Sequence, residues 1–195
     1  EELGLSGLTL HLNSIGDRNC RPQYLAVLRD YYRDRLEAGC EDCKGRFERN
    51  PLRLLDCKDA RCQPAIAGAP PFTDYLCDAC GEHFAQLRGF LEAVGIGYHL
   101  NPRLVRGLDY YTRTVFEVQP PEEGGQSSIG GGGRYDGLIE ELGGRPTPGI
   151  GFGTGIERIS INLKRQEVPL PAPRPLDCYV AHQTAAARTA AYRLA

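Results

Sequence analysis

The sequence lacks several features that would place it in a special class of protein. It contains no methionine and no tryptophan, and aromatic residues make up only 8% of its 195 residues. It has no apolar run long enough to cross a bilayer and no segment typical of a signal peptide, which argues against a membrane protein and favours the cytoplasm. Charge of one sign is not in excess, since 23 Lys and Arg accompany 25 Asp and Glu. This balance does not indicate a nucleic-acid partner, and it does not exclude one.

The rest of the composition is that of a soluble globular protein, with 41% hydrophobic and 25% charged residues. The length allows one or two domains. Because methionine is missing and the opening residues EELGLSGLTL are typical of the middle of a fold, we expect a part of a longer protein. Most of the 24 glycines follow Gly95, so we expect tight turns and the functional residues in the second half.

Hydrophobic periodicity predicts the secondary structure of the first half. A strand is expected over residues 8–15, followed by a helix that starts near Pro22 and stops at Gly39. A second helix is expected over residues 84–94, closed by glycines, before a short strand over 98–100. The stretch between these helices shows little periodicity, so only short helices and turns are predicted there.

Glycines separate the strands and helices that are expected in the second half of the chain. Residues 114–118 (TVFEV) are the clearest β segment. In SSIGGGGRYDGLIEELGG, four glycines precede a short helix that Asp136 is expected to cap and Gly143 to end. GIGFGTG then predicts a strand that runs into a helix, with Thr154 and Glu157 matching a capping box. The proline-rich segment that follows is typical of a stiff linker, and LDCYVA with an Ala-rich run indicates the opening strand and helix of a further α/β domain.

Six of the eight cysteines fall within one stretch: Cys40, Cys43, Cys57, Cys62, Cys77 and Cys80. The first and last pairs have the C-x2-C spacing of zinc knuckles and could together give a structural Zn²⁺ site. The four ligands of this expected site are Cys40, Cys43, Cys77 and Cys80. The two intermediate cysteines and His83 compete as ligands, and reduced thiols without metal are the alternative. A disulfide frame would require a secreted protein.

Arg158 lies in the first turn of the last expected helix of this region. A cation there opposes the helix macrodipole unless an anion such as phosphate binds. The alternating glycines before it, which end at Gly155, remove side chains from one face and would let a ligand approach the backbone. The alternative is a glycine-rich strand packed on its neighbour, with Arg158 in a salt bridge. The sequence contains neither a P-loop nor a dinucleotide fingerprint.

LVRGLDYYTRTVFE concentrates polar and aromatic residues just before the 114–118 strand. Arg106 is suited to hold a carboxylate or phosphate bidentately, and a hydroxyl of Tyr110 or Tyr111 to contact a polar ring. Such a cluster is typical of a site for a small zwitterion. The alternative is that the tyrosines are half-buried strand residues and that Arg106 pairs with Asp109.

These segments together resemble one family, the histidyl-tRNA synthetases, which are class II aminoacyl-tRNA synthetases. LVRGLDYYTRTVFE resembles the hallmark sequence of the family, IGGGGRYDGL its histidine pocket and PGIGFGTGIERI its motif 3. LNSIGDRNCR, NPLRLLDCK and APPFTDYLCDACGEHF resemble its bacterial insertion domain. The blocks occur in the right order and cover nearly the whole chain.

The resemblance implies a histidine–tRNA ligase of protein biosynthesis. Such an enzyme joins L-histidine to ATP, which is used with Mg²⁺, to form histidyl-adenylate, and it then transfers the histidine to tRNA(His). The full-length protein is expected to be a homodimer. By resemblance Arg106 is the catalytic arginine that stabilises charge at the α-phosphate. The residues assigned to L-histidine are Arg106, Tyr110, Tyr111 and Tyr135.

The resemblance also assigns the ATP site and two supporting residues. Arg158 matches the motif 3 arginine that contacts ATP, with Gly155 beside it. Asp109 and Arg113 are expected to support the site rather than to touch substrate, and Glu157 to act as a cap. Gly153 and Thr154 occupy positions where alanine and a larger apolar residue are more usual in the family, which affects the expected local packing.

The implied fold is α+β: a class II aminoacyl-tRNA synthetase-like antiparallel sheet with flanking helices, plus a mainly helical insertion domain. The expected divisions are a core strand in 1–15, the insertion domain with the cysteine cluster in 16–100, the catalytic core with motif 3 in 101–165, a Pro-rich linker in 166–175 and the start of a truncated anticodon-binding domain in 176–195. Motifs 1 and 2 of the family are missing, so we expect the isolated chain to be inactive and to bind ATP weakly at best.

Two other functions compete with the ligase. A synthetase-like regulatory subunit of ATP phosphoribosyltransferase, in histidine biosynthesis, resembles the same family without being a ligase. The intact RGLDYY block and the large insertion favour the synthetase. The insertion could also be a zinc-stabilised tRNA-binding module, and deletion of residues 16–100 would then abolish affinity for the acceptor stem.

Overall fold

The computed structural model describes the chain except for residues 1, 122–127, 170–171, 173–174 and 194–195. The strands are β1 (Thr9–Ser14), β2 (His99–Leu100), β3 (Thr112–Gln119), β4 (Gly130–Arg134) and β5 (Ile150–Thr154). The α-helices are α1 (Arg21–Arg33), α2 (Glu41–Arg49), α3 (Gln63–Ala67), α4 (Asp78–Ala93), α5 (Leu138–Glu141), α6 (Ile156–Arg165) and α7 (Ala185–Tyr192). Short 3-10 helices are η1 (Pro51–Leu54), η2 (Ala60–Cys62) and η3 (Phe72–Tyr75). None of the helices in the described residues is both long and apolar enough to span a bilayer.

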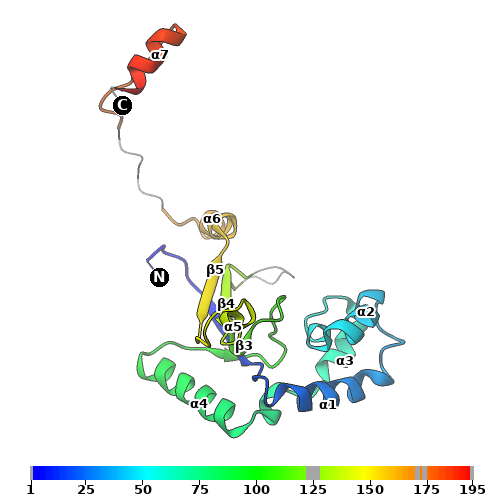
Figure 1. Cartoon of the computed structure of the whole chain (residues 1–195). Coiled ribbons are helices and arrows are strands. Elements are labelled where there is room, and N and C mark those ends of the chain that lie inside the picture. Colours follow the sequence, from blue (N-terminus) through cyan, green and yellow to red (C-terminus); the bar gives the residue numbers. More distant parts are fainter. Residues whose placement is uncertain (1, 122–127, 170–171, 173–174, 194–195) are drawn as a thin grey trace.

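The strands form one sheet in the order β2-β1-β3-β4-β5. β1 and β2 are parallel, whereas the β1–β3, β3–β4 and β4–β5 pairs are antiparallel. The β-branched and apolar residues of β3 place it at the centre, where Val115 is fully buried. The four consecutive glycines are a strand, β4, and lie directly between β3 and β5. A mainly antiparallel sheet with flanking helices confirms the expected α+β class (Figure 1).

The chain between β1 and β2 forms a helical unit beside the sheet. In Figure 1, α1, α2 and α3 gather on one side of the sheet and α4 runs along its lower edge. α1 buries Tyr24 and Leu28 completely. The Tyr24 ring lies 4.2 Å from that of Phe72, and its hydroxyl donates to the carbonyl of Pro70 at 2.8 Å. These residues belong to the same core cluster as Val115, so one hydrophobic core joins the helical unit to the sheet.

α1 ends earlier than the apolar periodicity predicts. Its last residue is Arg33, and the backbone N–H of Asp34 closes the final turn, whereas the expected stop was Gly39. Leu36 still packs against the core from the turn after the helix. A residue in a turn can therefore continue the apolar pattern of a helix without being helical.

Two expected caps do not form. The Asp136 carboxylate accepts hydrogen bonds from Arg134 Nε at 2.8 Å and from the Gly149 N–H at 3.3 Å, and it does not cap α5. The N-cap of α6 is Gly155, without a side-chain hydrogen bond, so Thr154 makes no capping box with Glu157. The reason is that Thr154 is still paired with β4 in the sheet, which fixes its backbone as strand.

The LDCYVA segment, residues 176–181, is not a strand. Its large residues Leu176 and Tyr179 are exposed, and no strand in the described part of the chain pairs with them. A single strand without a neighbour leaves its backbone groups without partners, which explains the difference. The expected helix does form as α7, where the Thr184 side chain accepts from the Ala187 N–H at 3.2 Å. The expected linker, 166–175, lies partly outside the described residues.

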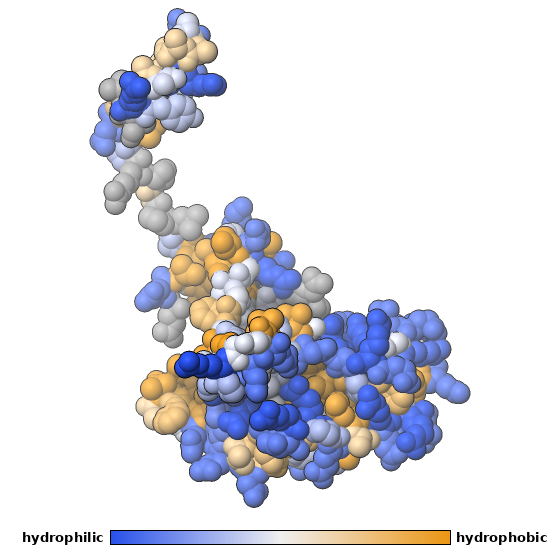
Figure 2. Space-filling model, in the orientation of Figure 1, coloured by the Kyte–Doolittle hydropathy of each residue, from blue (hydrophilic) through white to orange (hydrophobic). Residues whose placement is uncertain are grey.

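Apolar side chains are exposed at the β5 end of the sheet. Phe152 on β5 is 75% exposed and Ile156 on α6 is 74% exposed. Figure 2 shows apolar surface around α6 and the neighbouring strand. Because β5 is an edge strand, these residues mark a surface suited to contact with further protein.

Candidate functional site

Arg106 lies in the loop before β3 and forms an ion pair with Glu117 of that strand. Both side chains are largely buried, at 23% and 19% exposure. The Arg106 guanidinium also lies 5.9 Å from the centre of the Tyr111 ring. The alternative pairing of Arg106 with Asp109 does not occur, because Asp109 accepts a hydrogen bond from Asn50. The structure thus fixes one edge of the guanidinium, while its buried Nε has no hydrogen-bond partner among the described residues.

Glu117 was not among the residues expected at the site. It is the one acidic residue inside the TVFEV strand, and a carboxylate in the middle of a buried strand needs a partner. That requirement is a signal in the sequence, although it does not name Arg106. The glycine opposite Glu117 on β4 is Gly131. A Cβ there would lie 2.8 Å from the Phe116 carbonyl oxygen and 2.9 Å from Glu117 Cγ, so a larger residue would displace the backbone and the carboxylate that pairs with Arg106.

Three tyrosines meet beside this ion pair. The centre of the Tyr110 ring lies 4.7 Å from that of Tyr111 and 5.9 Å from that of Tyr135. The centres of the Tyr111 and Tyr135 rings are 6.4 Å apart. Hydrogen bonding with Tyr111 raises the pKa of Tyr110. The structure therefore brings together all four residues that the sequence assigned to one small ligand, although Tyr135 lies after β4, far along the chain from the other two tyrosines.

Tyr135 lies against the glycines of β5. A Cβ on Gly149 would lie 2.5 Å from Tyr135 Cε2, and one on Gly151 would lie 2.8 Å from its hydroxyl oxygen. The alternating glycines of β5 thus accept a protein side chain on this face. A cavity of about 200 Å³ is lined in part by Arg106, Asp109 and Tyr111. The site consequently offers an arginine, three phenolic hydroxyls and open space.

Arg158 lies in the first turn of α6, as the sequence predicts. Its Nη1 donates to the Ser128 carbonyl at 2.9 Å, just before β4. The side chain covers Gly155, where a Cβ would lie 3.3 Å from Arg158 Cδ. Gly155 in turn donates its N–H to the carbonyl of Ile129 at 3.0 Å. Arg158 and Arg106 therefore both contact the first half of the β4 region, from different elements.

The expected supporting residues reach the helical unit rather than the tyrosines. Arg113 Nη2 lies 3.4 Å from Asp17 Oδ2 in an ion pair. Arg113 has a positive φ of 53°, next to the irregular pairing of β3 with β4. The carbonyl of Tyr111 accepts from Arg21 Nη2 at 2.6 Å. These contacts attach the start of α1 to the segment that carries the tyrosines.

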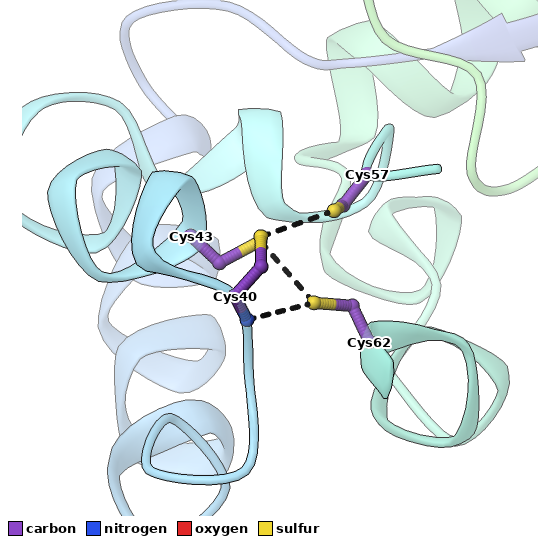
Figure 3. Close-up of side chains that lie close together, drawn as sticks. All are labelled: Cys40, Cys43, Cys57 and Cys62. Carbon is purple, nitrogen blue, oxygen red and sulfur yellow. Dashed lines mark hydrogen bonds between the residues drawn. The ribbon is translucent and has the colours of Figure 1, made fainter. Parts of the chain in front are cut away.

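The expected cysteine site is wrong in its grouping. The two C-x2-C pairs do not meet, because each has other partners close by. Cys40 and Cys43 lie with Cys57 and Cys62, and all four are buried (Figure 3). The second group consists of Asp17, Cys20, Cys77 and Cys80. His83 belongs to neither group.

The path of the chain explains the two groups. After α2, the chain returns through η1 and η2, which carries Cys57 and Cys62 back to the start of α2. The start of α4 instead lies beside the start of α1, so its pair meets Asp17 and Cys20. Burial raises the pKa of the Cys43 thiol and of the Cys80 thiol. The spacing of the cysteines contains no information on this return of the chain.

Comparison with known proteins assigns the chain to a family. The sequence model described as "Histidyl-tRNA synthetase" matches residues 70–159. The "Histidine--tRNA ligase" of Dehalococcoides mccartyi is 54% identical over 194 residues, which is 99% of this chain and 46% of the relative. That of Symbiobacterium thermophilum is 53% identical, over 98% of this chain and 45% of the relative.

The fold agrees with the sequence match. The crystal structure of apo Staphylococcus aureus histidyl-tRNA synthetase superposes with a TM-score of 0.68 at 34% identity, covering 99% of this chain and 47% of that one. The chain thus spans slightly less than half the length of the relatives it matches. The expected class II synthetase-like fold is confirmed by this match. The chain belongs to the histidyl-tRNA synthetase family.

Proposed function

We propose that the chain supplies the insertion and the carboxyl-terminal part of the catalytic core of a histidine–tRNA ligase. The observation that carries this proposal is the meeting of Arg106 with Tyr110, Tyr111 and Tyr135 beside β4. The reaction joins L-histidine and ATP to histidyl-adenylate and pyrophosphate, after which the histidine passes to tRNA(His). Mg²⁺ enters as part of the ATP complex.

Arg106 acts on the activation step. A carboxylate oxygen of histidine attacks the α-phosphorus of ATP, the bond to the β-phosphate oxygen breaks, and pyrophosphate leaves. Negative charge develops on the α-phosphate oxygens in the transition state, and a preorganised guanidinium stabilises it. Glu117 pairs with Nη1 of Arg106 and fixes the direction of the guanidinium that we propose to face the substrate. Arg106 also contacts the histidine carboxylate, which places the two reactants together.

The tyrosines bind the histidine side chain. The imidazole has one N–H donor and one nitrogen acceptor, and a phenolic hydroxyl can serve either. Tyr110 and Tyr135 are half-buried and face each other edge to face, and we propose that their hydroxyls contact the imidazole. Tyr111 is buried, and its ring lies beneath the Arg106 guanidinium. Recognition by hydroxyls rejects amino acids that lack a polar ring.

Arg158 and Gly155 are proposed to bind ATP. Arg158 lies at the amino-terminal turn of α6, where the helix dipole favours an anion. Gly155, at the N-cap, leaves room for the Arg158 side chain, which covers it. The proposed ATP contact lies near Ser128, just before β4, whereas Tyr135 follows β4.

We keep the expected divisions as a proposal. The core strand (1–15) contains β1, the insertion (16–100) holds both cysteine groups and ends with the short edge strand β2, and the core segment (101–165) contains β3 to α6. We propose that the exposed apolar residues of β5 and α6 contact the part of the enzyme that carries motifs 1 and 2, in a cytoplasmic homodimer. The isolated chain is accordingly proposed to be inactive. The regulatory-subunit alternative has less support, because the curated relatives described above carry the name of the ligase.

The test is ATP–pyrophosphate exchange by a chimera in which this chain replaces the matching segment of the D. mccartyi relative, to which it is 54% identical. The unmodified relative is the positive control, and each amino acid is supplied in turn. We expect exchange with histidine alone. A folded chimera that exchanges with no amino acid, or with a different one, would contradict the proposal.

A further inference from the structure

Four thiols in the helical unit surround a common point. The Sγ atoms of Cys40, Cys43, Cys57 and Cys62 all lie within 4.8 Å of one another. The Cys40 and Cys57 sulfur atoms are 3.7 Å apart, and those of Cys43 and Cys62 are 3.6 Å apart. Figure 3 shows the four side chains converging from α2, the segment after η1, and η2. A tetrahedron with Zn–S bonds of ~2.3 Å places sulfur atoms about 3.8 Å apart, so the spacing fits a Zn(Cys)4 centre.

The surroundings of this group fit bound thiolates. The backbone N–H of Cys40 donates to Cys62 Sγ at 3.4 Å, and a hydrogen bond to sulfur favours its charged form. Arg61 next to Cys62 forms its ion pair with Asp59, at 2.7 Å, and not with the sulfur atoms. The group therefore has a backbone donor directed at one of its sulfur atoms.

The two elements that carry Cys43 and Cys62 have few buried residues of their own. Cys43 is the only buried residue of α2, and Cys62 is the only one of η2. Helices of nine and three residues are marginal alone and need tertiary contacts. Phe47 of α2 packs against the core, and a ligand held by the four sulfur atoms would attach both elements to the rest of the unit as well.

We propose that Cys40, Cys43, Cys57 and Cys62 bind one structural Zn²⁺ ion. The ligand set differs from the pairing that the two C-x2-C motifs predict, because it uses only one of those motifs. The ion joins α2 to η2 and closes the loop between them. It takes no part in histidine activation, and the inference does not rest on the proposed ligase function.

The second group supports a second Zn²⁺ ion on its own geometry. The ligand atoms of Asp17, Cys20, Cys77 and Cys80 also lie within 4.8 Å of one another. Three thiolates and one carboxylate are all ligands that zinc accepts. The Asp17 N–H donates to Cys20 Sγ at 3.4 Å, and Arg113 of β3 pairs with the Asp17 carboxylate. This ion would fasten the starts of α1 and α4 to the sheet.

The first experiment uses the unmodified 195-residue chain. Zinc content is measured by mass spectrometry after purification, and Co²⁺ is titrated into chelator-treated protein. We expect two zinc ions per chain and the absorption bands of tetrahedral thiolate-bound Co²⁺. Seven of the eight cysteines should resist alkylation until a chelator is added. Folded protein with no metal, no cobalt bands and reactive or disulfide-bonded cysteines would overturn both assignments.

Variants distinguish the ligand sets. Cys57→Ser should remove one zinc ion, whereas a site made of both C-x2-C pairs would leave the zinc content unchanged in that variant. Cys77→Ser should remove the other ion. Cys178→Ser is the matched control, because Cys178 is exposed and belongs to neither group, and it should keep both ions. If a variant does not fold, the unmodified chain still decides. One Co²⁺ ion that protects Cys57 and Cys62 from alkylation while Cys77 and Cys80 react retains the first assignment and overturns the second.

Discussion

Arg106 and Glu117 form an ion pair that joins the loop before β3 to β3 itself, directly over Gly131 of β4. This pair fixes the direction of the arginine that we propose to act on the α-phosphate. The carboxylate does not touch substrate in this account, so Glu117 is a positioning residue. Its effect on the reaction should pass through Arg106.

Glu117→Gln should lower kcat of histidine-dependent pyrophosphate exchange in the chimera by ~10- to 100-fold. KM should change much less, because the amide removes the charge that fixes Arg106 without removing a substrate contact. Glu117→Asp should recover part of kcat. A variant that loses only thermal stability and keeps kcat would show that the pair is merely structural.

Gly131→Ala should destabilise the chain by ~1–3 kcal/mol, since a Cβ placed against backbone atoms forces the strands apart. The added carbon would lie 2.8 Å from the Phe116 carbonyl oxygen. Urea unfolding measures the change. Gly153→Ala is the matched control from the same sheet, because a Cβ at that glycine meets nothing within 4 Å. Equal effects of the two substitutions would refute the steric argument.

Tyr135→Phe should raise the KM of the chimera for histidine by ~10- to 100-fold and leave the KM for ATP nearly unchanged. The ring and its packing on β5 remain, so the loss reports only the hydroxyl. Steady-state exchange at varied histidine concentration measures it. A parallel rise in both KM values would place Tyr135 outside the histidine pocket.

His11 should make the stability of the sheet depend on pH. Burial lowers the pKa of His11 below its usual value, and the neighbouring His99 lowers it further, while Glu117 opposes the shift. The unfolded chain therefore binds the proton more readily than the folded chain. The stability contribution of His11 is full above its ordinary pKa of about 6.5 and is lost as the pH falls toward the lower, folded pKa.

The matching measurement is urea unfolding between about pH 8 and about pH 5, on the unmodified chain and on His11→Gln. As the pH falls, the free energy of unfolding of the unmodified chain should decrease relative to that of His11→Gln. A difference that is independent of pH would contradict the expected direction.

The sequence predicts several of the local elements. β1, β3 and the passage from β5 to α6 lie where periodicity and glycine placed them, whereas α4 begins at Asp78, six residues before the expected start of that helix. The structure also brings Arg106 together with the three tyrosines, although their role in binding substrate stays a prediction. Tyr135 was assigned to the pocket by resemblance, and its position over Gly149 and Gly151 shows physically why those glycines are needed. The alternating glycines at positions 149 and 151 therefore reflect the packing of the Tyr135 ring against this part of the sheet.

Contacts that depend on the path of the chain were not predictable. The partner of Arg106 is Glu117, eleven residues away, rather than the nearby Asp109. Cys57 and Cys62 return to Cys40 only because η1 reverses the chain, and spacing does not encode this. Thr154 does not cap α6 because sheet pairing holds its backbone. In each case a tertiary contact overrides a short-range pattern.

The central claim is that Arg106 stabilises the transition state of histidine activation. The most direct test is histidine-dependent ATP–pyrophosphate exchange by the chimera carrying Arg106→Ala or Arg106→Lys, beside the unsubstituted chimera and a Cys178→Ser control. We expect kcat/KM to fall by at least ~100-fold in Arg106→Ala, with little rescue by lysine, whose ammonium cannot reproduce a guanidinium held by Glu117. Folded Arg106→Ala protein with exchange close to that of the control would contradict the claim.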